Sequence, residues 1–170
     1  MARYRIVPER SKIWAEGRSS LHPIKVETTG LEGYLEANVV DGHVEFLQPP
    51  KANVELESER LKTGNGLYDR ELERRLEVRK YPRVRGTVRS VTTTDSGSTY
   101  HVQGNLTLAG RSHAVEGDVT ARIVDGATIA FEGEQVIDMR DFGLEPPKIL
   151  MLRVYPDVKV RGLVVAQLEN

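Results

Sequence analysis

The feature that most constrains the fold is an alternation of apolar and polar residues that recurs along most of the chain. Between residues 98 and 108, Val102 and Leu106 share one face, and Gln103 and Thr107 share the other. Successive side chains of a strand point to opposite faces, so this pattern predicts a half-buried β-strand. Comparable runs occupy residues 13–17, 52–56, 84–88, 112–123, 127–139 and 158–164.

Short turn signals separate these runs. Asp, Ser and Gly gather at 41–42, 95–98, 109–112 and 124–126, which is typical of hairpin turns. About eight strands joined in this way predict sequential antiparallel pairing. A strongly twisted sheet of that size tends to close on itself, because closure removes its exposed edges. We therefore predict an all-β fold, an eight-stranded antiparallel barrel formed by residues 1–170 as a single domain.

One position interrupts the alternation. Ile24 and Val26 lie at even positions, whereas Leu31 and Leu35 lie at odd ones. A shift of one residue exchanges the two faces of a strand, so the change near Thr29 predicts a β-bulge or a sharp bend.

Glycine recurs on the apolar face of nearly every predicted strand. Glycine is unfavourable inside a strand, so each one needs a structural reason. Curvature of the barrel is one reason, and room for a ligand inside it is another. The glycines concerned are Gly17, Gly33, Gly86, Gly104, Gly117, Gly133 and Gly162.

The inward face predicted from this parity is almost entirely aliphatic, so a cavity inside the barrel would favour an apolar ligand. Burial of each methylene group contributes about 0.8 kcal/mol, and a long hydrocarbon therefore suits such a tube better than a sugar or nucleotide. The predicted ligand-binding residues, including two from a predicted helix at the mouth, are Ile13, Ala15, Gly17, Leu72, Leu76, Val84, Val88, Val102, Leu106, Val115, Val119, Ile129, Phe131 and Ile137.

The stretch 64–80 differs from the rest, because it is dense in charge and has a helical period. Tyr68, Leu72 and Leu76 recur every four residues and form a narrow apolar stripe. Glu71 and Arg75 are spaced for an ion pair on the helix surface, and Pro82 is expected to end the helix. The pattern indicates one amphipathic helix that covers the barrel, either as a plug on side chains or as a lid over a ligand.

Composition excludes several other classes of function. The chain has 24 basic and 25 acidic residues, so its net charge of −1 gives no basic field for nucleic acid. Cysteine is absent, which excludes disulfides and thiolate metal sites. The N-terminal residues lack the apolar core of a signal peptide, and no run is long enough for a transmembrane segment. We therefore expect a cytoplasmic protein that does not bind nucleic acid.

No motif for catalysis, a metal or a cofactor accompanies this pattern. The four histidines lack metal-ligand spacing, and the sequence has neither a nucleophile elbow nor a phosphate-binding loop. We expect a non-enzymatic protein without a cofactor. The oligomeric state is left open, and a homodimer is possible. Two alternative functions also remain open. One alternative is an enzyme that acts on a small apolar substrate through Tyr100, Gln135, His22 or His113. The other is an interaction protein whose barrel is filled by side chains.

Four stretches, in order, resemble the YceI-like family of polyisoprenoid-binding proteins. They are SKIWAEGRSS (11–20), LKTGNGLYDRELERRLEVRKYPRVRGTV (61–88), GNLTLAGRSHAV (104–115) and IDMRDFGL (137–144). The resemblance implies a lipocalin-like barrel with one helix, whose interior binds a polyisoprenoid, a polyprenyl phosphate or an isoprenoid quinone. It also implies storage, transport or sensing of such a lipid as the function.

Overall fold

Antiparallel hairpins dominate the fold, because most runs of alternating residues pair with a neighbour in the chain. The computed structural model describes residues 1–94, 96–149 and 151–170, and Asp95 of the predicted 95–98 turn lies outside the described residues. The elements are β1 (Ala2–Ile6), η1 (Pro8–Arg10), β2 (Lys12–Ser19), β3 (Ile24–Thr29), β4 (Glu32–Val40), β5 (His43–Phe46), β6 (Ala52–Glu57), η2 (Ser58–Arg60), α1 (Gly66–Leu76), β7 (Arg83–Thr93), β8 (Thr99–Leu108), β9 (Arg111–Asp125), β10 (Thr128–Asp138), η3 (Met139–Phe142), β11 (Lys148–Ile149) and β12 (Leu152–Leu168).

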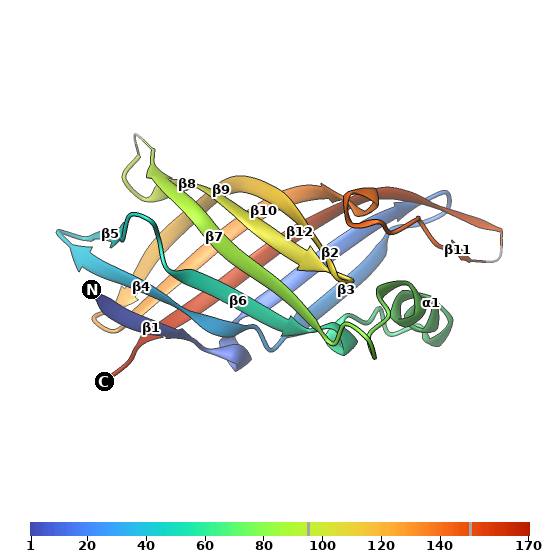
Figure 1. Cartoon of the computed structure of the whole chain (residues 1–170), viewed down its shortest axis with the longest axis horizontal. Helices are drawn as coiled ribbons and strands as arrows, with labels where there is room; N and C mark the ends of the chain where they lie inside the picture. The colour runs from blue at the N-terminus through green and yellow to red at the C-terminus, as the bar shows by residue number, and fades with distance from the viewer. Residues whose placement is uncertain (95, 150) are drawn as a thin grey trace.

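Eight of the strands close into a barrel (Figure 1). Pairing runs in the order β1, β4, β6, β7, β8, β9, β10 and β12, and β12 pairs back to β1. The closing pairs join Tyr4 to Leu168 and Ile6 to Ala166, and all the pairs around the ring are antiparallel. The predicted eight-stranded antiparallel barrel with one helix is confirmed.

Strand β12 is 17 residues long and connects the closed ring to a flanking sheet. Its last residues pair with β1, whereas its earlier residues pair with β2, which in turn pairs with β3. The predicted change of register near Thr29 is a sharp bend, where the chain leaves β3 and enters β4. Gly30 lies there with φ of +101°, and its N–H donates to the Pro8 carbonyl at 3.0 Å.

One end of the barrel is closed by packed side chains. Strand β5 reaches from β4 toward β8 across this end, where the Tyr100 hydroxyl donates to the Val44 carbonyl at 2.7 Å. The same hydroxyl accepts from the Val44 N–H at 3.1 Å, and the Phe46 ring meets the Tyr100 ring edge-on. The buried side chains of this core are Tyr4, Leu35, Ala37, Val44, Val91, Tyr100, Ile129, Phe131 and Ala166.

Helix α1 lies at the opposite end of the barrel (Figure 1). The Asn65 side chain caps its first turn by accepting from two backbone N–H groups, those of residues 67 and 68. The prediction that the helix continues to residue 80 is wrong, because Glu77 adopts the left-handed conformation with φ of +48°. Its N–H and that of Val78 then bond to carbonyls of the last helical turn, which ends the helix well before Pro82. The predicted Glu71–Arg75 ion pair is confirmed at 3.5 Å.

A second buried cluster joins the helix to the segment that follows β10. Leu76 is almost fully buried and packs with Phe142 and Leu144. The short helix η3 brings Phe142 there, and its first turn is held by Asp138, which pairs with Arg140 at 2.7 Å. This cluster anchors the C-terminal turn of α1, whereas Leu72 lies at its edge and is only half-buried.

The outer face of the β8–β9 hairpin carries a polar cluster centred on His101. His101 lies opposite Asp118 in the ladder, and its Nδ1 is 2.9 Å from that carboxylate. Its Nε2 is 3.2 Å from the Glu116 carboxylate. The bond to Asp118, followed by that to Glu116, raises the pKa of His101 above its ordinary value. Bonds from Gln103 and then His101 lower the pKa of Glu116.

Substitution of Leu76 by Ala is predicted to reduce the free energy of unfolding by about 2–5 kcal/mol, as expected for truncation of a buried leucine. Leu67→Ala, on the exposed side of the same helix, is the matched control and should change stability by less than about 0.5 kcal/mol. Urea unfolding followed by circular dichroism measures both values. Equal effects of the two variants would contradict the anchoring role of Leu76.

The His101 cluster is predicted to make stability depend on pH. Because the pKa of His101 is raised in the folded state, the stabilisation is fully present below the unfolded value of about 6.5. It is lost as the pH rises through the folded pKa. The melting temperature of the wild-type protein should therefore exceed that of His101→Gln by more at about pH 5.5 than at about pH 8.5. A difference that is constant across this range would rule out the linkage.

Candidate ligand-binding cavity

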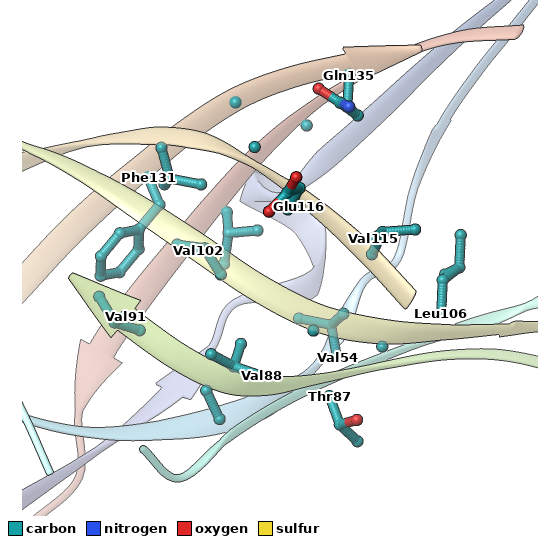
Figure 2. A pocket seen from close by; sticks show the side chains of 18 of the residues that line it. Val54, Thr87, Val88, Val91, Val102, Leu106, Val115, Glu116, Phe131 and Gln135 are labelled. Carbon is teal, nitrogen blue, oxygen red and sulfur yellow. The ribbon is translucent and has the colours of Figure 1, made fainter. Parts of the chain in front are cut away.

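The interior of the barrel between its two packed ends is hollow. One cavity of about 410 Å³ lies toward the closed end, and Figure 2 shows part of its lining. A second cavity of about 290 Å³ lies beneath α1. Inward-facing valines such as Val84, Val88 and Val102 are only half-buried, since they border empty space. The alternative of a barrel filled by side chains is therefore wrong.

The two cavities adjoin and follow the length of the barrel. They share the lining residues Ile13, Val54, Gly86, Leu106, Ile137 and Val160. The inward residues of β12 trace the path, because Val158 lines the smaller cavity, Val160 lines both and Val164 lines the larger. At about 3.4 Å per residue, the stretch from Val158 to Val164 spans about 20 Å of strand.

The structure brings together nearly all of the residues predicted to bind a ligand. The predicted residues that line one or both cavities are Ile13, Ala15, Gly17, Leu72, Leu76, Val84, Val88, Val102, Leu106, Val115, Val119, Phe131 and Ile137. Ile129 differs, because it is buried in the core of the closed end and lines neither cavity. A ligand role for the lining residues stays a prediction.

Two kinds of glycine occur on the inward face, which answers why the sequence places so many there. A Cβ atom at Gly33 or Gly104 would collide with a carbonyl oxygen of the neighbouring strand, so these positions permit close backbone approach. Gly133 and Gly162 face each other across the β10–β12 ladder and line the larger cavity. A Cβ at Gly162 would meet only the tip of Ile13 at 3.4 Å, so this glycine leaves room. Room inside the barrel therefore explains Gly162, whereas close backbone approach, a reason not considered from the sequence, explains Gly33 and Gly104. Curvature stays a prediction.

The smaller cavity has its mouth beneath α1. Tyr68, Leu72 and Leu76 of the helix stripe all line it, together with the aliphatic part of β3. Arg75 also lines this cavity, and its guanidinium lies 3.5 Å from the Glu71 carboxylate. The Tyr68 hydroxyl is 3.2 Å from Nε2 of His22, which ties the helix to the β2–β3 turn. The helix therefore combines a plug at Leu76 with a cover at Tyr68 and Leu72.

The larger cavity reaches the surface between β9 and β10. Ladder pairing between these strands ends at Gly133 and Val119. Within the described residues, the first part of β9 pairs only with β8, and the last part of β10 only with β12. The exposed Glu116 and Gln135 line the cavity at this gap, and Figure 2 shows both between the two strands.

The polar residues of the enzyme alternative do not meet at one point. Tyr100 is bonded to the main chain at the closed end, whereas His22 is bonded to Tyr68 at the mouth. His113 is exposed and lies 3.9 Å from Asp141, and of the four only Tyr100 and Gln135 line a cavity. Among the described residues there is no cluster of three or more His, Cys, Asp or Glu arranged to hold a metal ion.

The sequence analysis missed some of the lining. Val54, Val158, Val160 and Val164 follow the same parity as the chosen residues, so the alternation could have identified them. Residues from irregular segments carry no such signal, because tertiary packing alone brings them to the cavity. These include Leu31, Leu61, Met139, Leu144 and Pro147.

In the part of the chain that the structure describes, no helix is long and apolar enough to cross a membrane. A search of curated protein sequences found no match.

Solved structures with the same fold come from several bacteria. BcnA of Burkholderia cenocepacia superposes with a TM-score of 0.78 at 19% identity, covering 95% of this chain and 99% of its own. A polyisoprenoid-binding domain of Saccharophagus degradans, implicated in plant cell wall breakdown, has a TM-score of 0.77 at 12% identity, covering 99% and 100%. A YceI protein of Campylobacter jejuni has a TM-score of 0.64 at 19% identity, covering 82% and 81%.

The sequence itself matches a family model over most of its length. The model describes the YceI-like domain and aligns with residues 4–166. This range includes the helix at the mouth and all strands of the closed ring except the first two residues of β1 and the last two of β12. The chain belongs to the YceI-like domain family.

Proposed function

We propose that this protein binds a long-chain apolar lipid, with the hydrocarbon chain in the two adjoining cavities. A polyisoprenoid, a polyprenyl phosphate or an isoprenoid quinone has the required chemistry, and storage, transport or sensing of that lipid is the role. The observation that carries the proposal is the hollow, almost entirely aliphatic tube inside a closed barrel. Membership of the YceI-like family and the likeness to a polyisoprenoid-binding domain support it.

The size of the tube suits a chain rather than a compact molecule. Ligand sites usually enclose 300–1,000 Å³, and the larger cavity alone measures about 410 Å³. Each buried methylene contributes about 0.8 kcal/mol, so a chain of roughly a dozen carbons supplies enough free energy for micromolar binding after the costs of association. No polar partner is needed along the tube.

Charge favours entry at the mouth beneath α1. Glu116, Asp118 and Glu134 line the larger cavity beside the gap between β9 and β10, where His101 bonds the first two and Lys159 pairs with Glu134 at 3.2 Å. Three carboxylates against one lysine and one histidine make this edge unfavourable for a phosphate group. The lining beneath α1 contains Arg75 and Tyr68 together with Glu55 and Glu145, and the Glu55 carboxylate pairs with Arg83 and Arg85. A lipid with an anionic or polar end therefore enters tail-first and leaves that end at the helix.

Substitution of Val160 by Phe is predicted to divide the tube, because Val160 lines both cavities and a benzyl group fills their junction. Retention of a long polyprenol should fall at least tenfold, whereas a short chain of about ten carbons should still bind beneath the helix. Native mass spectrometry of protein loaded with each lipid measures both. Glu132→Phe, which adds the same ring on the outer face of β10, is the matched control and should bind like the wild-type protein. Full retention of the long chain by Val160→Phe would contradict the proposal.

Leu72→Ala is predicted to release bound lipid several-fold faster with little loss of stability, because Leu72 covers the mouth and is only half-buried. The rate of transfer of a fluorescent isoprenoid to acceptor micelles measures the release. Val136→Ala, at an exposed valine on the outer face of β10, is the matched control and should release lipid at the wild-type rate. If Leu72→Ala leaves that rate unchanged, the helix is not a cover.

A further inference from the structure

The end of the barrel that holds the mouth also carries the most exposed large apolar side chains. Leu21, in the β2–β3 turn, is 79% exposed, and Met151, in the β11–β12 turn, is 97% exposed. Leu67, in the first turn of α1, is 41% exposed. Transfer of such side chains from water into an apolar phase lowers the free energy, so an exposed group of them indicates a contact surface.

These three segments are joined to one another around the mouth. The Ser20 N–H donates to the Arg153 carbonyl at 2.8 Å, and the Arg153 N–H donates to the Ser20 hydroxyl at 3.1 Å. His22 then contacts Tyr68 of α1 through both a 3.2 Å bond and ring stacking. Figure 1 shows the β2–β3 turn, the β11–β12 hairpin and α1 together at the end opposite the termini.

Basic residues accompany the exposed apolar ones in the two turns that carry Leu21 and Met151. The segments 18–25 and 148–155 together contain Arg18, Lys25, Lys148 and Arg153 and no acidic residue. Arg18 pairs with Asp157 at 3.1 Å, and both Arg18 and Arg153 lie over the Tyr155 ring. Tyr155 itself lines the smaller cavity, so the basic rim is continuous with the mouth.

The turns at the opposite end of the barrel differ in charge. Its turns 40–43 and 124–127 contain Asp41 and Asp125 and neither lysine nor arginine. Its exposed apolar residues include Val39 at 42%, Val124 at 38% and the N-terminal Met1 at 52% (Figure 1). The turns at the two ends therefore differ, because those at the mouth combine the highest apolar exposure with lysine and arginine and those at the far end carry aspartate.

We propose that the mouth end, defined by Leu21, Leu67, Met151 and the rim of Arg18, Lys25, Lys148 and Arg153, docks on the anionic surface of a lipid bilayer. Exposed apolar side chains flanked by lysine and arginine are the features that hold a protein at such a surface. Tyr68 and Tyr155 suit the membrane interface, because tyrosine favours the boundary between headgroups and hydrocarbon. Docking in this orientation places the mouth of the tube against the lipids. Docking itself does not depend on the proposed function; only its purpose, the transfer of lipid through the mouth, rests on that function.

Co-sedimentation of the full chain, free of lipid ligand, with vesicles tests the proposal. The wild-type protein should bind vesicles of phosphatidylcholine with about 30% phosphatidylglycerol much more strongly than phosphatidylcholine alone, and added salt should weaken this binding. Leu21→Glu/Met151→Glu should reduce the partition at least tenfold. The matched control Val39→Glu/Val124→Glu adds the same charge at the far end and should bind within about twofold of the wild-type protein, with circular dichroism showing that both variants are folded.

A second pair of substitutions measures the contribution of charge alone. Lys148→Gln/Arg153→Gln should weaken binding to the anionic vesicles by about 30-fold, because each basic residue near such a surface contributes about 1 kcal/mol. The pair should leave the weak binding to phosphatidylcholine unchanged. Equal binding to both kinds of vesicle, or equal losses in the mouth and far-end variants, would overturn the proposal. A third outcome would also overturn it: the wild-type protein does not bind vesicles but forms a dimer, and Leu21→Glu/Met151→Glu dissociates that dimer.

A crossed measurement separates this proposal from that of lipid binding. The Leu21→Glu/Met151→Glu variant should take up a polyprenol from detergent micelles as the wild-type protein does, but extract it more slowly from anionic vesicles. Val160→Phe should fail to retain the polyprenol from either source and still dock on empty vesicles. If the protein docks on vesicles but never retains a lipid, the proposed function is contradicted and the docking surface is not. If the protein takes up lipid but never docks on vesicles, the docking proposal is contradicted and the proposed function is not.

Discussion

The closed ring of backbone hydrogen bonds is the constraint on which the rest of the structure depends. Because β12 pairs with β10 on one side and with β1 and β2 on the other, the middle of the barrel is held by its ladders. Most protein cores must instead be filled, since packed side chains supply their cohesion. A closed barrel of eight strands can hold its shape around a vacant interior, and that permits glycine and valine where larger residues would otherwise be needed.

This division places stability and binding in different parts of the molecule. The packed side chains lie at the two ends, with Tyr100 and Phe131 at the closed end and Leu76 and Phe142 at the mouth. The residues between them are half-buried and border the cavities. Substitutions in the middle therefore alter the shape of the tube at small cost to folding, whereas substitutions at the ends remove buried contacts. The helix belongs to both parts, because Leu76 is anchored while Leu72 covers the mouth.

Parity along the strands explains why so much of this architecture could be predicted from the sequence. The side-chain period of a strand is two, so choosing the apolar face also identifies the side chains that point inward. Ile129 shows the limit of this argument, since parity gives the side of the sheet and not the depth along the barrel. The end of α1 at Glu77 was missed because a left-handed cap without glycine leaves little trace in the sequence. The separation of β9 from β10 depends on register between strands, which alternation does not determine.

Under the proposed function, the chemistry of the tube also determines where selectivity among lipids resides. A cavity lined by aliphatic side chains recognises length and shape, and one methylene group more or less changes affinity by about 0.8 kcal/mol, or roughly fourfold. Its polar lining is concentrated at the gap beside Glu116 and at the mouth beside Arg75. The end group of the lipid can therefore be distinguished only where the tube meets the surface. Under the proposed function, discrimination between a polyprenyl phosphate and a quinone depends on Tyr68, Arg75 and the rim around them, and the accepted chain length depends on the distance from that rim to Phe131.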